Sequence, residues 1–168
     1  DLLLRTNKLD PARVAYENAL HLFQQIDNRL GEANTLQGLG LLALTKQDAA
    51  DAFRRFASLL DVYRAIDERM GQQAALGYAA RAAADLAETD RALLLAGASL
   101  ALGWEVDDRF GQAINLRLLL GLFQQADDDF GFAAGLALYR VVLGQLGDEQ
   151  RQAEMDHLWR QPEARVPA

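Results

Sequence analysis

Cysteine is absent from the sequence, and only three prolines occur in its 168 residues. Without cysteine the chain can form no disulfide and has no thiol chemistry, and this composition fits a reducing compartment such as the cytoplasm. Two of the prolines lie in the last seven residues, so the residue that interrupts helices is nearly missing from the rest. Val, Ile and Thr are sparse, whereas Ala and Leu dominate, and this balance favours helix over strand.

A basic cluster and a long apolar run are missing as well. The formal net charge is −7, and because affinity for nucleic acid depends on Lys and Arg, we expect no nucleic-acid partner. No apolar run approaches the roughly 18–20 residues that span a membrane, so we expect a cytoplasmic chain without a membrane partner. The chain is 51% hydrophobic, which is enough for a substantial core. It starts with Asp1 and not with Met, and we expect it to be a piece of a longer protein.

One short phrase occurs three times at a constant spacing of 40 residues. In each copy an apolar residue is followed by Asp, an acid or amide, Arg, a second apolar residue and Gly. The copies occupy residues 26–31, 66–71 and 106–111, and a fainter trace follows at residues 146–148. A fixed period in the range of about 20–50 residues predicts an array of stacked repeats.

Each 40-residue unit divides into two helical stretches. Apolar residues advance by three or four positions within residues 30–43 and again within 52–63, which is the pattern of amphipathic helices. The pair Asp10-Pro11 predicts a helix start, because it combines a cap with a proline at the first helical position. The sequence therefore predicts helices at about 11–25, 29–45, 49–65, 69–86, 90–105, 109–125, 129–145 and 149–160.

The Asp, Arg and Gly of the phrase each have a structural and a functional explanation. The Asp is expected to cap the following helix, the alternative being an acidic ligand site. The Arg is expected to pair with acids of a neighbouring helix, the alternative being an anionic partner. The Gly is expected to allow close approach of the preceding helix, since a phosphate loop would need a Lys-Ser or Lys-Thr that is missing. These residues are Asp27, Asp67 and Asp107; Arg29, Arg69 and Arg109; and Gly31, Gly71 and Gly111.

No combination of residues predicts catalysis, a metal or a cofactor. His21 and His157 belong to different predicted helices, and without cysteine they offer no transition-metal site. Ser58 and Ser99 have no nearby histidine, so no nucleophile and base are paired. The aspartates at 127–129 lack the ligand spacing of a calcium loop and are expected to start a helix. We therefore expect a protein that is not an enzyme.

Several of these residues resemble the tetratricopeptide repeat (TPR) family. Leu36, Leu39 and Gly40 of one predicted helix are followed by Ala52 and Phe56 of the next at the family's spacing. The resemblance implies an all-α, right-handed α-α superhelix, a solenoid of antiparallel helix hairpins. The period is 40 residues instead of about 34, as in the long-helix branch of the family, and a HEAT-type repeat is the alternative because its period overlaps. The implied parts are units at about 1–26, 27–66, 67–106 and 107–146, a capping helix at 149–160 and a loose tail at 161–168.

In this family the first helices of successive units line a concave groove that binds a protein segment. The resemblance implies such a groove here, suited to a peptide or a helix. Gln37 and Leu41 occupy two places where some relatives hold a carboxylate clamp, so a clamp of that kind is not expected. The implied groove positions are Asn34, Gln37, Leu41 and Leu44; Ala74, Gly77, Arg81 and Asp85; and Ile114, Arg117, Gly121 and Gln124.

The resemblance therefore implies a non-enzymatic interaction or scaffold module. The repeated phrase also resembles repeats of bacterial regulatory proteins, in which such arrays follow a signalling ATPase or a protease-like domain. One alternative is an autoinhibitory or sensor segment that binds its own parent protein, and another is a spacer with an empty groove. Self-association through the apolar Leu2-Leu3-Leu4 is a further expectation. Trp104 and Phe110 flank a turn and are expected either to pack the joint between units or to anchor a partner.

Overall fold

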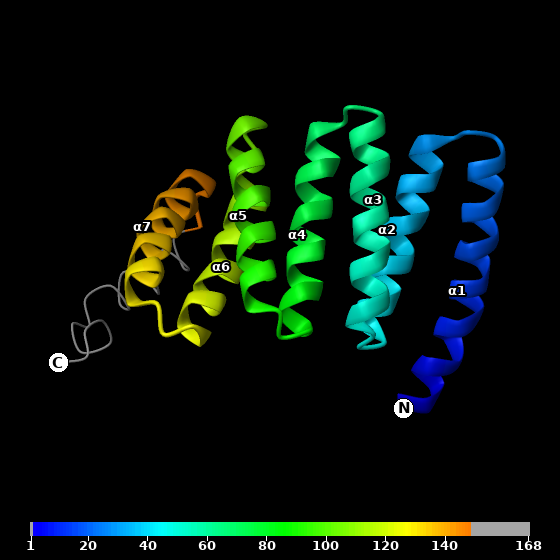
Figure 1. The fold of residues 1–168 in the computed structure, drawn as a ribbon, viewed down its shortest axis with the longest axis horizontal. Coiled ribbons are helices and arrows are strands. Elements are labelled where there is room, and N and C mark those ends of the chain that lie inside the picture. The colour runs from blue at the N-terminus through cyan, green and yellow to red at the C-terminus, as the bar shows by residue number, and fades with distance from the viewer. Residues whose placement is uncertain (1, 149–168) are drawn as a thin grey trace.

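The structure, a computed structural model, describes the backbone of residues 2–148 and the side chains of residues 11–148. This part of the chain is a succession of helices without a strand. They are α1 (Leu2–Gln25), α2 (Arg29–Thr45), α3 (Ala49–Ala65), α4 (Arg69–Asp85), α5 (Thr89–Glu105), α6 (Arg109–Gln125) and α7 (Asp129–Leu146). Each helix packs antiparallel against the one before it, and the result is an all-α helical-repeat solenoid (Figure 1).

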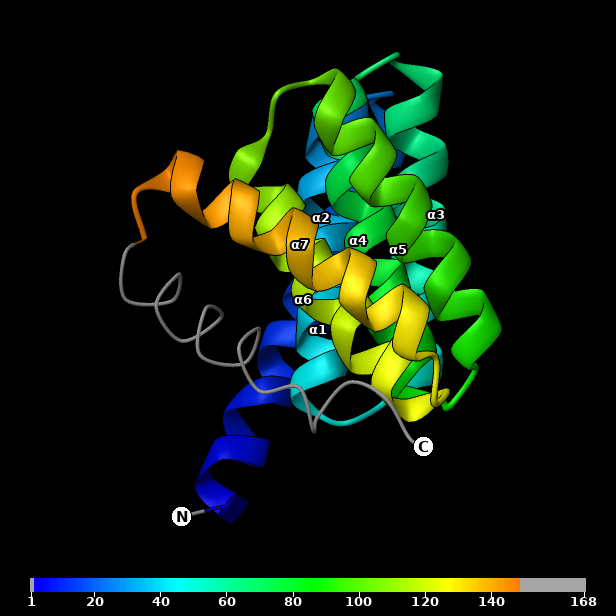
Figure 2. The same cartoon turned by 90° about the vertical axis from the view of Figure 1, so that its left-hand side faces the viewer.

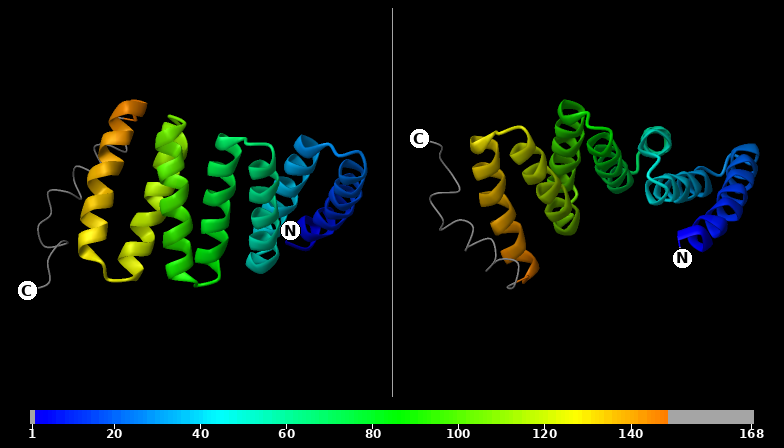
Figure 3. Two further views of the ribbon diagram at one scale, coloured as in Figure 1. Left: turned by 45° about the horizontal axis from the view of Figure 1, so that its top comes forward. Right: turned by 90° about the horizontal axis from the view of Figure 1, so that it is seen from below.

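The helices form one row. Helices α1 and α7 lie at its opposite ends, and the row does not fold back on itself in either further view (Figure 3). Viewed from the α7 end, α3 and α5 lie along one side of the row and α6 along the other (Figure 2). In the first view α3 lies in front of α2, and α5 lies in front of α6 (Figure 1). The first and second helices of each unit thus face opposite sides.

The helix boundaries follow the sequence pattern closely. Helices α2 to α6 have 17 residues each, and the predicted boundaries of α2 to α7 agree with the structure to within one residue. The predicted start of the first helix is wrong, because α1 runs from Leu2 through Pro11. A proline inside a helix lacks one backbone N–H, and the helix here tolerates that loss with the ring exposed to solvent. The predicted helix at 149–160 and tail at 161–168 lie outside the described residues.

The core lies between neighbouring helices, and Phe56 of α3 shows how it is built. Its side chain is fully buried and stacks on Tyr78 of α4, with ring centroids 5.0 Å apart. Gly40 of α2 lies against the same ring, because a Cβ there would come within 2.6 Å of Phe56 Cζ. Full burial of such a side chain stabilises the fold by about 1.5–3 kcal/mol.

All six turns between these helices share one geometry. The second residue after each helix has a φ between 52° and 61°, in the left-handed region. The next residue is the N-cap of the following helix, and in five of the six turns its side chain accepts a hydrogen bond from a backbone N–H of the first helical turn. The exception is Glu88, which makes no such bond at the start of α5.

The predicted capping role of the Asp in the repeated phrase is wrong by one residue. Asp27, Asp67 and Asp107 are the left-handed residues of their turns. The caps are the residues that follow them, and each accepts from the N–H of the phrase's Gly. The physical reason is that Asp and Asn enter the left-handed region more readily than other non-glycine residues. These caps are Asn28, Glu68 and Asp108.

The prediction of close approach at the phrase's Gly is confirmed at two of its three positions. A Cβ on Gly31 would come within 2.6 Å of Phe23 Cγ, and one on Gly71 within 2.6 Å of Tyr63 Cδ1. Both rings belong to the preceding helix. At Gly111 a Cβ would meet the cap Asp108 and Gln73 of α4, because Gly103 leaves no side chain at the place of Phe23 and Tyr63.

The prediction for the Arg of the phrase is confirmed at one position. Arg69 of α4 pairs with Glu105 at the end of α5. Arg29 instead pairs within its own turn and helix, with Asp27 at 2.9 Å and Glu32 at 3.2 Å, and Arg109 pairs with Asp107 at 3.3 Å. Asp67 lies two residues before Arg69 as well, so the local sequence does not decide which acid each Arg meets. The joint at Arg69 differs because Glu105, at the end of α5, lies within reach of Arg69.

Candidate protein-binding groove

One face of the row is hollowed by a groove of about 690 Å³. Its lining residues come from α2, α4 and α6 together with the cap of α6, so the first helices of three successive units share it. Helices α4 and α6 also pack directly against each other beneath it. The groove is more apolar than polar, with Leu41 and Leu44 at one end and Ile114 and Phe110 toward the other.

Nine of the twelve groove positions implied by the resemblance line this groove, and three do not. Asn34 and Gln124 are exposed outside it, while Gln37 is half-buried and donates a hydrogen bond to the Tyr78 hydroxyl at 3.4 Å. The nine are Leu41, Leu44, Ala74, Gly77, Arg81, Asp85, Ile114, Arg117 and Gly121. The helical period places these residues on one face of each first helix, whereas the packing of the helices decides that Asn34 and Gln124, on the same face, lie outside the groove.

Small residues keep the middle of the groove open. A Cβ added at Gly121 would meet nothing within 4 Å. A Cβ at Gly77 would lie 3.1 Å from Asn115 Oδ1, so any larger residue there would cover that amide. Because Gly within a helix costs about 1 kcal/mol relative to Ala, two glycines in one groove need a compensating reason. Space for another chain beside the helix backbone is one such reason.

The charges in the groove are not evenly compensated. Arg81 pairs with Asp85 one turn later on α4, at 3.2 Å. Asp108 accepts from the N–H of Gly111 at 2.9 Å and so serves the start of α6. Arg117 has no hydrogen-bond or ion-pair partner among the side chains described. The groove therefore offers one free guanidinium within a largely apolar lining.

A buried polar network lies between the groove and α5. Ser99 of α5 donates to the backbone carbonyl of Gln73 at 2.7 Å, and Asn115 Nδ2 donates to Ser99 Oγ at 2.8 Å and to the Gly111 carbonyl at 3.0 Å. Since the Ser99 hydroxyl proton is used on a carbonyl, it must accept from Asn115, and this fixes the orientation of the amide. Asn115 Oδ1 is left without a partner within the described residues.

Other residues of the groove were not among the groove positions that the resemblance implied. Phe110 follows the capped turn of α6, and Tyr78, Leu118 and Gln125 lie beside predicted positions. Phe110 is 67% exposed and lines the groove, whereas Trp104 is 44% exposed and does not line it. Whether either side chain packs the joint between units or anchors a partner stays a prediction. The repeated phrase could have drawn attention to Phe110, because the fifth residue of the phrase is apolar in every copy.

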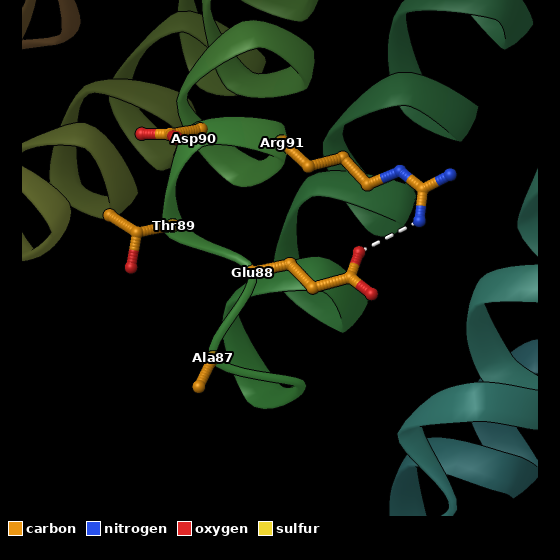
Figure 4. A pocket seen from close by; sticks show the side chains of 5 residues that line it. All are labelled: Ala87, Glu88, Thr89, Asp90 and Arg91. Carbon is orange, nitrogen blue, oxygen red and sulfur yellow. Dashed lines mark hydrogen bonds and ion pairs between the residues drawn. The ribbon is translucent and has the colours of Figure 1, made fainter.

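A second, shallower concavity lies at the turn between α4 and α5 (Figure 4). Five consecutive residues, 87–91, form it, and no other element contributes a side chain. Glu88 and Arg91 are bound to each other at 2.7 Å. The third charged residue, Asp90, points away from this pair (Figure 4). The turn therefore has no converging groups that could hold a ligand.

Other kinds of site receive no support from the described residues. Among residues 11–148, whose side chains the structure describes, no three His, Cys, Asp or Glu side chains lie close enough to share a metal ion. None of helices α1 to α7 combines the length and the apolar character needed to cross a bilayer. The side chains of Leu2-Leu3-Leu4 lie outside those described, so self-association through them stays a prediction.

Comparison with known proteins gives no further guidance, since no protein-family model and no curated protein matches the chain.

Proposed function

We propose that the chain is a TPR-like protein-interaction module whose groove binds a peptide or a helix of another protein. The observation that carries the proposal is the groove itself, which runs across α2, α4 and α6 and has an apolar lining, open glycine positions and a free guanidinium. Apolar side chains supply most of the binding free energy in helix-in-groove recognition, and a few polar groups set the register. Proteins that bind in this way need no catalytic residues.

The relation to TPR proteins is supported by the contact between Gly40 and Phe56. In the family pattern a small residue of the first helix faces a large residue of the second, and Gly40 lies against the Phe56 ring here. Ala52, at the family's small position in the second helix, is fully buried. We further propose that the module works inside a larger cytoplasmic regulatory protein of bacterial type, on the basis of the repeated phrase.

Photo-crosslinking tests the groove. A photoreactive residue would replace Leu41, Ile114 or Arg117 in turn, with Ser58 on the exposed side of α3 as the matched control. Each variant would be exposed to cell lysate and its products identified by mass spectrometry. We expect one protein to be captured from all three groove positions and not from Ser58.

Binding of the captured protein to the purified chain would then be measured by calorimetry. We expect Ile114→Asp to weaken it by about tenfold or more, because a carboxylate would enter the apolar lining, and Ser58→Asp to leave it unchanged. Equal capture from Ser58, or unaltered binding to Ile114→Asp, would contradict a ligand groove and leave a spacer.

A further inference from the structure

The two ends of the groove are apolar, and its middle carries a positive charge. Leu41 and Leu44 lie near the end of α2 and form one apolar end, whereas Phe110 and Ile114 lie near the start of α6 and form the other. Helices α2, α4 and α6 run in the same direction, because consecutive helices alternate, so the two apolar ends lie diagonally opposite across α4. Arg117 lies at the middle of α6, at a level along the helices between these two ends.

Arg117 is the one charged group of the groove that has no partner among the side chains of residues 11–148. Arg81 already pairs with Asp85 at 3.2 Å, and Asp108 accepts from a backbone N–H at the start of α6. The Arg117 side chain is exposed, so a ligand in the groove can reach it. A carboxylate complements a free guanidinium, and opposite charges across an interface set the specificity and register of binding.

The position of Arg117 indicates a carboxylate within the ligand chain and not at its C-terminus. The apolar lining continues from Arg117 toward Ile114 and Phe110 in one direction and toward Leu41 and Leu44 in the other. A chain that ended at Arg117 would leave one of these two ends empty. The side chain of an internal Asp or Glu lets the ligand place an apolar residue in each end, where burial contributes most to affinity.

Polar groups along the groove favour an extended ligand over a helix. Gln73, Asn115 and Gln125 line the groove, and Asn115 Oδ1 is without a partner in the described part of the chain. Gly77 and Gly121 leave the backbones of α4 and α6 open to close approach. An extended chain has unpaired backbone N–H and C=O groups that need polar partners, whereas a helix satisfies these groups internally.

The dimensions of the groove set the length of the ligand. Ile114 stands two repeats after Asn34, and Asn34 lies ten residues before Leu44, so the two apolar ends are about 15 Å apart along the helices. Two spacings between neighbouring helices add roughly 16–20 Å across the row. The diagonal is then roughly 20–25 Å, which about seven extended residues cover.

We propose that the groove binds an extended segment of about seven residues, with an internal Asp or Glu between two apolar residues. The carboxylate pairs with Arg117, one apolar side chain lies against Ile114 and Phe110, and the other lies against Leu41 and Leu44. This specificity rests on the function proposed above, because it needs a groove that binds another chain. It adds the chemistry of the partner and the direction in which the partner crosses the row.

Selection from a library of random peptides tests this specificity. The peptides are displayed within a loop of a phage coat protein, so neither terminus is free, and are selected on the natural chain, on Arg117→Glu and on Arg64→Glu. Arg64 is an exposed arginine of α3 outside the groove and is the matched control. We expect the natural chain and Arg64→Glu to select Asp or Glu at one position between two apolar positions. Arg117→Glu should select Lys or Arg at that position and retain the apolar ones.

Fluorescence anisotropy then measures the binding of the peptide consensus selected on the natural chain. Replacement of its acidic residue by the matching amide should raise the Kd for the natural chain by about fivefold or more, and the Kd for Arg117→Gln by less than about twofold. Proline placed in turn at each interior position of the peptide should be tolerated in at least one place. Loss of binding at every position would indicate a helix and overturn the extended ligand.

The Ile114→Asp variant separates failure of this specificity from failure of the groove. Peptides that lose binding to Ile114→Asp but carry no fixed acidic position, or that keep the same acid when selected on Arg117→Glu, would overturn the proposed ligand and leave the groove as a binding site. If no peptide is selected, or the selected peptides bind Ile114→Asp as well as the natural chain, the proposed function fails and this specificity fails with it.

Discussion

The glycine of the repeated phrase is selected by a contact between helices. Gly31 lies in the first turn of α2, where its N–H donates to Asn28 Oδ1 at 2.9 Å. Its hydrogen, in place of a Cβ, lets the Phe23 ring of α1 lie against the backbone. Gly97, in the middle of α5, has nothing within 4 Å of the place where a Cβ would stand. The two glycines therefore respond to different physical demands.

Replacement by alanine should separate these two cases. We expect Gly31→Ala to lower the free energy of unfolding by about 1–3 kcal/mol, because the Phe23 ring must shift to admit the methyl group. We expect Gly97→Ala to raise it by up to about 1 kcal/mol, since alanine is the better helix former and meets no neighbour. Urea unfolding followed by circular dichroism measures both. A loss of stability in Gly97→Ala as large as that in Gly31→Ala would contradict the contact.

Tyr63 gives a prediction about alkaline pH. Burial, followed by the Glu68 carboxylate and Tyr78, raises the pKa of the Tyr63 hydroxyl above its ordinary value of about 10. The folded state thus holds the neutral phenol, while the unfolded state ionises first. The stabilising contribution is complete below pH of about 10 and is lost as pH rises through the folded-state pKa.

The free energy of unfolding of the natural chain should therefore fall between pH of about 9 and 11, and that of Tyr63→Phe should fall less. Urea titrations at the two pH values measure the difference. Tyr16→Phe, at a solvent-exposed tyrosine of α1, is the control and should follow the natural chain. Equal slopes in Tyr63→Phe and Tyr16→Phe would show that Tyr63 does not carry the effect.

Helix α5 differs from α3 at the centre of its packing. Ser99 stands where α3 has Leu59, and both are fully buried. The serine connects α5 to α4 through the Gln73 carbonyl and to α6 through Asn115. A hydrogen-bonded joint of this kind fixes the distance between three helices, whereas an apolar joint constrains only volume. Hydrogen bonds therefore fix how α4, α5 and α6 pack beneath the groove.

We expect Ser99→Ala to destabilise the chain by about 1–3 kcal/mol, because the Asn115 amide loses its acceptor and the Gln73 carbonyl loses a donor. Ser58→Ala, at an exposed position of α3, should change the free energy of unfolding by less than about 0.5 kcal/mol. Chemical denaturation compares the two variants. An effect of Ser99→Ala no larger than that of Ser58→Ala would show that the network contributes little.

Across the row of helices, the middle helix α4 has more buried residues than the end helix α1. Helix α4, in the middle, has nine buried residues, while α1 has none among residues 11–25. In a solenoid each unit is stabilised mainly by its neighbours, so an end helix with one neighbour opens most easily. The groove depends on units that lie beside one another, because its lining comes from three of them.

Hydrogen exchange measured by mass spectrometry should reveal this gradient. We expect amides of α4 to exchange most slowly and those of α1 at least about tenfold faster, because opening α1 exposes little buried surface. Peptides from α3 and α5 should resemble α4. Protection of α1 equal to that of α4 would mean that the whole row opens as one cooperative unit.

The sequence predicted the helices well because the signals that end and start them are local. Each turn repeats a left-handed residue, a cap and a short helix start, and these act over five residues or fewer. The period of 40 residues then placed equivalent positions on equivalent faces, which is why most implied groove residues line the groove. The predicted start of the first helix at residue 11 was wrong because a helix can also accommodate a proline in its interior when the proline is exposed.

The sequence by itself determined the number of residues per helix, the period of the array and the side of each helix that is apolar, because these follow from spacing along one chain. Only the tertiary structure decided which acid each Arg of the phrase meets, that Ser99 and Asn115 pair beneath the groove, and that Phe110 and Met70 face solvent. Arg69 and Glu105 are 36 residues apart, and Ser99 and Gln73 are 26 apart. Contacts over such separations depend on how helices dock, and docking is decided by the summed shape of many side chains.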